Sequence, residues 1–184
     1  MGGTFNNPAR VGVVGLGNVL MGDDAFGPYV IEVLEAAYAL PPNVSAQDLG
    51  TPSLDLTGYI EDFDVLIVVD TVHSQGEPGE LRKYTREELL KRPVQPRTSP
   101  HEPGLKEALL IAEFHGRGPS EVMLIGVIPE TTSTGVGLSA RVRAAIAPAV
   151  QEILSELRRL GCEAAPLDSP RRPQVWWEEA AQAV

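Results

Sequence analysis

Residues 65–69 form an unbroken aliphatic run, Val-Leu-Ile-Val-Val, which ends at Asp70. A run of this length without a polar residue is typical of a strand that is buried on both faces, as in the parallel sheets of α/β proteins. Ligand sites in such proteins lie outside the carboxyl ends of the strands. The sequence therefore predicts an α/β fold in which Asp70 lies at the edge of the sheet that carries the site.

A second acidic position follows an earlier strand in the same way. Residues 11–15 predict a strand, residues 16–22 a turn, and Asp23 and Asp24 the start of an amphipathic helix. Because parallel strands end at a common edge, Asp24 and Asp70 are expected to converge there and to attract a cation. The alternative is that Asp23 and Asp24 only cap the helix and interact with its dipole.

The rest of the chain alternates between strand and helix patterns, which predicts a three-layer α/β/α sandwich. Pro148 should kink or divide the last long helix, because proline removes a helical hydrogen bond. Two adjacent tryptophans in the tail cannot share one helical face, so at least one should pack onto the domain or a partner. The further predicted strands cover residues 43–48, 79–84 and 122–127. The further predicted helices run through Leu54, Leu56 and Ile60, from a capping box at residues 85–88, from near 104, and over 139–160. The remaining predictions are an irregular proline-rich stretch over 92–103, one domain over 1–165, and a tail over 166–184.

Composition excludes several classes of protein. The chain has 184 residues, 43% of them hydrophobic, which suits one domain with a full core. A net charge of −10 argues against nucleic acid as a partner. Cys162 is the single cysteine, so neither a disulfide framework nor a thiolate metal site is expected. We recognise no secretory signal and no apolar run near the roughly 20 residues that span a membrane, which predicts a cytoplasmic protein.

The glycine-rich turn does not match a dinucleotide-binding fingerprint. That fingerprint needs a third glycine three positions after Gly17, where this chain has Leu20. Asp23 and Asp24 would also repel a phosphate from the start of the helix. A nucleotide-binding oxidoreductase is therefore a remote alternative.

Four motifs together resemble the maturation endopeptidases of nickel–iron hydrogenases, over residues 11–164. They are Gly15-x-Gly17-Asn18-x-Leu20-x-x-Asp23-Asp24-x-x-Gly27, Asp70 after the apolar strand, Ser99-Pro100-His101-x-x-Gly104-Leu105, and Gly126-Val127-Ile128-Pro129-Glu130. Members of that family remove a C-terminal extension from the hydrogenase large subunit after nickel has been inserted. The resemblance implies that the large-subunit precursor is the partner of this chain.

The resemblance also implies the site and the sheet. Asp24, Asp70 and His101 occupy the positions of the family's metal-binding and catalytic residues. The family accepts Glu or Asp at the first position, whereas Pro103 departs from the hydrophobic residue that usually follows the histidine. The implied sheet has five strands in the order 2-1-3-5-4, with the fourth antiparallel, which suits the polar segment 79–84.

The donor set itself favours a borderline metal ion. Two carboxylates and one imidazole can hold nickel, zinc or iron and leave positions open for other ligands. Because a fourth protein ligand is missing, we expect nickel to arrive with the substrate.

The apolar turn at Val19, Leu20 and Met21, with the 71–79 loop, is expected to border a groove for an extended peptide. The alternative function is a noncatalytic, nickel-sensing chaperone of the large subunit. For His73 and His115 we expect ordinary surface roles.

Overall fold

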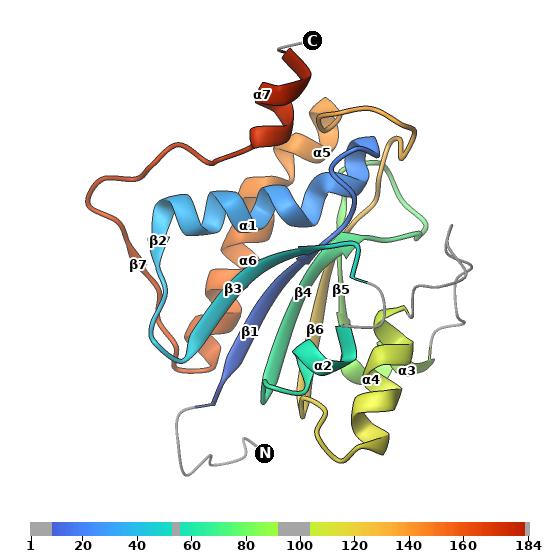
Figure 1. Ribbon diagram of the computed structural model, residues 1–184, viewed down its shortest axis with the longest axis vertical. Coiled ribbons are helices and arrows are strands. Elements are labelled where there is room, and N and C mark those ends of the chain that lie inside the picture. Colours follow the sequence, from blue (N-terminus) through green and yellow to red (C-terminus); the bar gives the residue numbers. More distant parts are fainter. Residues whose placement is uncertain (1–8, 53–55, 92–103, 183–184) are drawn as a thin grey trace.

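A five-stranded sheet lies between two layers of helices in the computed structural model, which describes residues 9–52, 56–91 and 104–182 (Figure 1). The sheet order is β3-β1-β4-β6-β5. The strands are β1 (Val11–Leu16), β3 (Val44–Gly50), β4 (Val65–Thr71), β5 (Leu81–Thr85) and β6 (Glu121–Val127). All neighbours are parallel except β5 and β6. Counted along the chain, this is the predicted order 2-1-3-5-4 with an antiparallel fourth strand, so the prediction is confirmed.

The side chains of β4 alternate between the two faces of the sheet and so create two cores. Val65, Ile67 and Val69 contribute to the core under α1 (Phe26–Ala37) and α6 (Ile146–Arg159). Leu66 and Val68 contribute to the opposite core, under α2 (Leu56–Ile60), α3 (Arg86–Lys91) and α4 (Leu105–Phe114). A strand with both faces covered must be apolar throughout, which explains the aliphatic run.

Local sequence signals set two of the helix boundaries. The segment 139–160 is divided into α5 (Ala140–Ala144) and α6, and the division precedes Pro148 by a few residues. Pro148 has no N–H to donate to the preceding turn, so the predicted division is confirmed. Before α3, the Thr85 N–H donates to Glu88 Oε2 at 2.8 Å and the Glu88 N–H donates to Thr85 Oγ1 at 3.4 Å, which is a capping box.

The C-terminal segment packs against the domain. Its β7 (Ala165–Pro166) pairs with β2 (Tyr38–Ala39), and α7 (Trp176–Gln182) lies near the carboxyl ends of the strands (Figure 1). Trp177 is buried and meets the Tyr29 ring edge-on at 5.2 Å, whereas Trp176 is 63% exposed. The expectation that at least one tryptophan packs onto the domain is confirmed.

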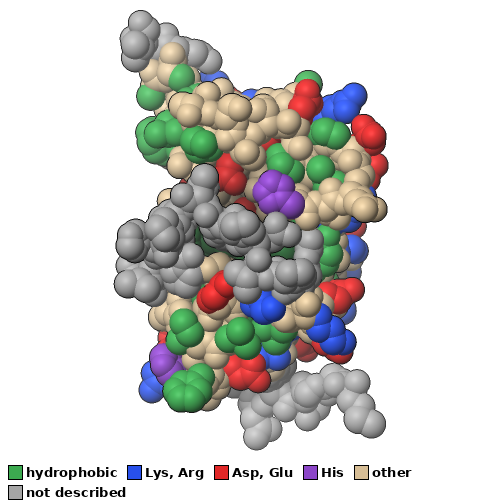
Figure 2. Space-filling view, turned by 90° about the vertical axis from the view of Figure 1, so that its right-hand side faces the viewer, with side chains coloured by type: hydrophobic (Ala, Val, Ile, Leu, Met, Phe, Trp, Pro, Cys, Tyr) green, Lys and Arg blue, Asp and Glu red, His purple; other side chains and the backbone are tan. Residues whose placement is uncertain are grey.

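On the face shown in Figure 2, basic side chains lie among acidic ones. Among the described helices, none is long and apolar enough to cross a membrane. Cys162 is buried, and its sulfur accepts a hydrogen bond from Asn43 Nδ2 at 3.1 Å.

Candidate functional site

Thr71 joins the two predicted aspartate positions at the carboxyl edge of the sheet. Its hydroxyl donates to Asp24 Oδ1 at 3.0 Å, and its backbone N–H donates to Asp70 Oδ1 at 2.8 Å. Asp70 comes from the end of β4, and Asp24 comes from the 3-10 turn η1 (Gly22–Ala25) that precedes α1. One residue thus contacts both carboxylates, as expected for side chains from neighbouring strand exits.

The glycine-rich turn positions the Asp24 carboxylate. Gly17 has a φ of 140°, and a Cβ there would lie 1.7 Å from the Asp24 carbonyl oxygen, so only glycine fits. The next residue, Asn18, donates its N–H to Asp24 Oδ2 at 2.9 Å. The Gly17 N–H in turn donates to the carbonyl oxygen of Gly50 at 2.8 Å. The turn therefore orients a carboxylate where a nucleotide-binding turn would hold a phosphate.

The two carboxylates have the chemistry of cation ligands. Asp24 and Asp70 are both half-buried, so each is fixed in position but can still be reached from outside. Each Asp24 oxygen accepts one of the hydrogen bonds described above, which leaves further lone pairs for a cation. Hydrogen bonds of this kind orient ligand side chains around metal ions in proteins. Carboxylates suit divalent ions of hard to borderline character.

The third predicted ligand, His101, lies outside the described residues. The helix that follows it is described: α4 begins at Leu105, with Gly104 as its N-cap residue, as predicted. Within the described part of the chain, no group of three or more His, Cys, Asp or Glu side chains is placed to share a metal ion. The trio of Asp24, Asp70 and His101 as metal ligands and catalytic residues therefore stays a prediction.

Asp23 has a structural role that the sequence did not reveal. Its carboxylate is fully buried and accepts hydrogen bonds from the backbone N–H groups of Glu130 at 2.8 Å, Thr131 at 3.0 Å and Ser139 at 2.7 Å. It also accepts one from the Ser139 hydroxyl at 3.0 Å, and that hydroxyl caps α5 through the Val142 N–H. Asp23 therefore fastens a distant loop and does not cap the helix beside it, which corrects the capping alternative for this residue.

The loop that Asp23 holds, residues 130–139, lies beside the glycine-rich turn of residues 17–22. The N–H of Gly135 donates to the carbonyl oxygen of Leu20, and the N–H of Gly22 donates to the carbonyl oxygen of Gly135, each at 2.9 Å. Two apolar side chains are exposed on the joined segments: Leu20 at 54% and Val136 at 38%. An apolar rim next to two carboxylates suits contact with a peptide. The predicted groove at this place stays a prediction.

The other candidate residues have ordinary roles. His115 is the C-cap residue of α4, and its Nδ1 lies 2.7 Å from Glu61 Oε1. His73 is exposed in the loop after β4. Asp48 accepts a hydrogen bond from the Gly50 N–H at 2.8 Å, and burial raises the pKa of its carboxyl.

Comparison with known proteins identifies the family. The family model described as hydrogenase maturation protease matches residues 28–156. The chain is 36% identical over 160 residues to the hydrogenase 2 maturation protease of Escherichia coli (strain K12), covering 87% of this chain and 98% of that protein.

Solved structures agree with the sequence comparison. The hydrogenase maturating endopeptidase HybD from Escherichia coli matches with a TM-score of 0.77 and 37% identity, over 85% of this chain and 97% of that one. The NiFe hydrogenase maturation protease HycI from Thermococcus kodakarensis KOD1 matches with a TM-score of 0.67 and 26% identity, over 84% of this chain and 96% of that one. The family match covers well over half of the chain, and the structures share its sheet and helices. The chain therefore belongs to the hydrogenase maturation protease family.

Proposed function

We propose that this protease removes the C-terminal extension of a hydrogenase large-subunit precursor that already contains nickel. The observation that supports this most is the joint contact of Thr71 with Asp24 and Asp70, which fixes two carboxylates at one edge of the sheet. His101, which lies outside the described residues, is the third ligand in this proposal. The nickel belongs to the substrate and is not a resident cofactor of this chain.

The incomplete ligand set explains how cleavage can depend on nickel insertion. Two carboxylates and one imidazole leave coordination positions of a divalent ion open, as in metal sites where three protein ligands leave a place for water or substrate. Ligands of the precursor supply the remainder only when its metal is in place. The protease then recognises a filled precursor and hydrolyses one amide bond with one water molecule.

A cleavage assay tests the proposal. Purified protein is incubated with nickel-loaded precursor and, separately, with nickel-free precursor in the presence of a chelator. The masses of the products are then measured by mass spectrometry. We expect a shortened product only from the loaded precursor. Cleavage of the nickel-free precursor would refute metal sensing but leave the protease, whereas binding of the loaded precursor without any cleavage would favour the chaperone alternative.

Variants of the carboxylates and of Thr71 locate the site. Asp24→Asn and Asp70→Asn should abolish cleavage, because an amide is a poorer cation ligand than a carboxylate. Thr71→Val removes the hydroxyl that orients Asp24, and loss of such an outer partner typically costs roughly 10–100-fold in metal affinity or activity. Thr71→Ser keeps the hydroxyl and should restore cleavage. Asp168→Asn is the control, because Asp168 is exposed and far along the chain from these residues.

A further inference from the structure

Strand β3 forms one edge of the sheet, and part of its backbone faces outward. Among the described strands it pairs with β1 alone. The N–H of Val11 on β1 donates to the carbonyl oxygen of Asn43, and alternate residues of a strand face opposite sides. The backbone N–H and C=O of Ala46 therefore point away from β1. The strand contains neither lysine nor proline, the residues that commonly protect an exposed edge from pairing.

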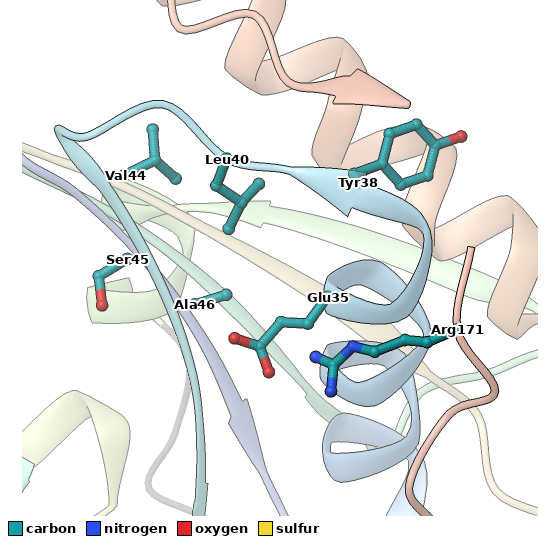
Figure 3. A pocket seen from close by; sticks show the side chains of 7 residues that line it. All are labelled: Glu35, Tyr38, Leu40, Val44, Ser45, Ala46 and Arg171. Carbon is teal, nitrogen blue, oxygen red and sulfur yellow. The ribbon is translucent and has the colours of Figure 1, made fainter. Parts of the chain in front are cut away.

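A pocket of about 340 Å³ lies beside the amino-terminal half of this edge. Val44 and Ala46 of β3 line it, together with Glu35 of α1 and Arg171 of the C-terminal segment. Figure 3 shows the ends of the Glu35 and Arg171 side chains facing each other between α1 and β3. Burial raises the pKa of the Glu35 carboxyl, and the nearby Glu32 raises it further. The pocket could accept one side chain of a strand placed against the edge.

The other end of β3 leads to the candidate site. The carbonyl oxygen of Gly50, the last residue of β3, accepts the hydrogen bond from Gly17, and the next residue, Asn18, binds the Asp24 carboxylate. β3 has 7 residues, so the edge spans roughly 20 Å at about 3.3 Å per residue. A peptide laid along this edge would connect the pocket to the two carboxylates.

We propose that the precursor segment that follows the scissile bond adds to β3 as an antiparallel strand. This inference rests on the proposed function. The segment begins at the scissile bond, which lies at the carboxylates, and extends away from the folded part of the precursor. Gly50 is the end of β3 next to the carboxylates, so the segment runs from Gly50 toward Val44, against the direction of β3. Backbone hydrogen bonds supply affinity in this mode of recognition, and pockets for alternate side chains supply specificity.

The pocket presents one charge of each sign. Among the residues that line it, Glu35 is the one acidic and Arg171 the one basic residue, and Val44 and Ala46 add apolar surface. The side chain that enters this pocket belongs to a residue about five to seven positions after the scissile bond.

N-methylation of the peptide tests the strand pairing with the wild-type protein. The probe is a synthetic peptide with the sequence of the precursor's extension, methylated at one backbone nitrogen at a time. We expect alternate positions to lose roughly threefold to tenfold in affinity, because only every second N–H of an added strand faces β3. Losses without alternation, or no losses, would overturn the proposal.

Proline variants test the same edge from the protein side. Ala46→Pro removes an outward N–H of β3, whereas Lys83→Pro is the matched control on β5, the opposite edge. The Glu80 carbonyl accepts from Ile128 next to β6, so alternation places the Lys83 N–H outward too. We expect Ala46→Pro to raise the KM for precursor several-fold and Lys83→Pro to leave it unchanged. Equal cleavage by both variants would overturn the proposal.

Two further measurements separate the possible failures. If the wild-type protein cleaves no precursor, the proposed function fails, and the methylation scan then decides on its own whether β3 binds this peptide. Circular dichroism checks that Ala46→Pro folds, and if it does not, the scan again decides. Sedimentation would overturn the proposal if Ala46→Pro dissolved a dimer of this chain without changing peptide binding, because the edge would then serve self-association.

Discussion

The substitution Asp23→Asn tests the claim that a buried carboxylate fastens the loop beside the site. Asp23 Oδ2 accepts hydrogen bonds from Glu130 N, Thr131 N and Ser139 Oγ, and Oδ1 accepts one from Ser139 N. Asparagine keeps a single acceptor oxygen. If that oxygen takes the Oδ2 position, the amide NH2 must face the Ser139 N–H, and two donors then oppose each other.

The expected cost follows from these bonds. A hydrogen bond to a charged group contributes roughly 1.5–3 kcal/mol, against about 1 kcal/mol for a neutral one. The variant loses one charged bond and weakens the other three, while water relieves part of the loss at Glu130 and Thr131, which are exposed. We expect the free energy of unfolding to fall by roughly 2–4 kcal/mol, and Tm by roughly 5–15 °C for a domain of this size.

Thermal unfolding followed by circular dichroism measures this change, with Asp168→Asn as the control for the same chemical change on the surface. A double-mutant cycle with Ser139→Ala should show a coupling energy of at least about 0.5 kcal/mol, because Ser139 contacts the carboxylate directly. A Tm for Asp23→Asn equal to that of the control would refute the reasoning.

Three other changes give separate tests. Trp177→Ala should cost roughly 3 kcal/mol or more, up to the point where α7 detaches, whereas Trp176→Ala should stay within about 0.5 kcal/mol because its side chain is 63% exposed; denaturant unfolding measures both. Leu20→Asp should weaken precursor binding in a pull-down without changing Tm, and unchanged binding would place the peptide elsewhere. The hydrogen bond from the Tyr29 hydroxyl lowers the pKa of Glu178 below its ordinary 4.5, and the hydrogen bond from Arg143 adds to this effect. The contribution of ionised Glu178 to the docking of α7 is therefore complete above pH 4.5, and it is lost as the pH falls through the lower pKa of the folded state. Both tryptophans of the chain lie in α7, so a shift of their emission in that acidic range reports detachment, and an unchanged spectrum would contradict it.

Periodic apolar patterns made the fold predictable from sequence. The aliphatic run of β4 needs two covered faces, and that requirement alone implies a layer of helices on each side of the sheet. Local chemistry was equally informative where it acts within a few residues, as for the capping box at Thr85 and the division of the helix before Pro148. The polar strand β5 was predictable as an edge because it has few apolar side chains to bury.

Polar contacts between distant segments were not predictable. Asp23 binds backbone groups 107 to 116 residues later in the chain, and backbone donors leave no signal in the sequence. The docking of α7 depends in the same way on Glu178, which accepts hydrogen bonds from Tyr29 and Arg143, far away in sequence. The adjacent tryptophans indicated that at least one indole ring must be buried, but not which surface of the domain buries it.

Asp23 and Asp24 show why adjacency in sequence says little about shared function. Both lie in η1, and successive side chains of a 3-10 helix are rotated by about 120° from each other. The rotation turns Asp23 inward to a fully buried position, where four neutral donors use its oxygens, and turns Asp24 toward Thr71 at the edge of the sheet. A buried carboxylate with its acceptors occupied cannot also bind a cation from outside, whereas the half-buried Asp24 can. The first aspartate therefore holds the loop of residues 130–139 in place, and of the two only the second is placed for the cation-binding role that we propose.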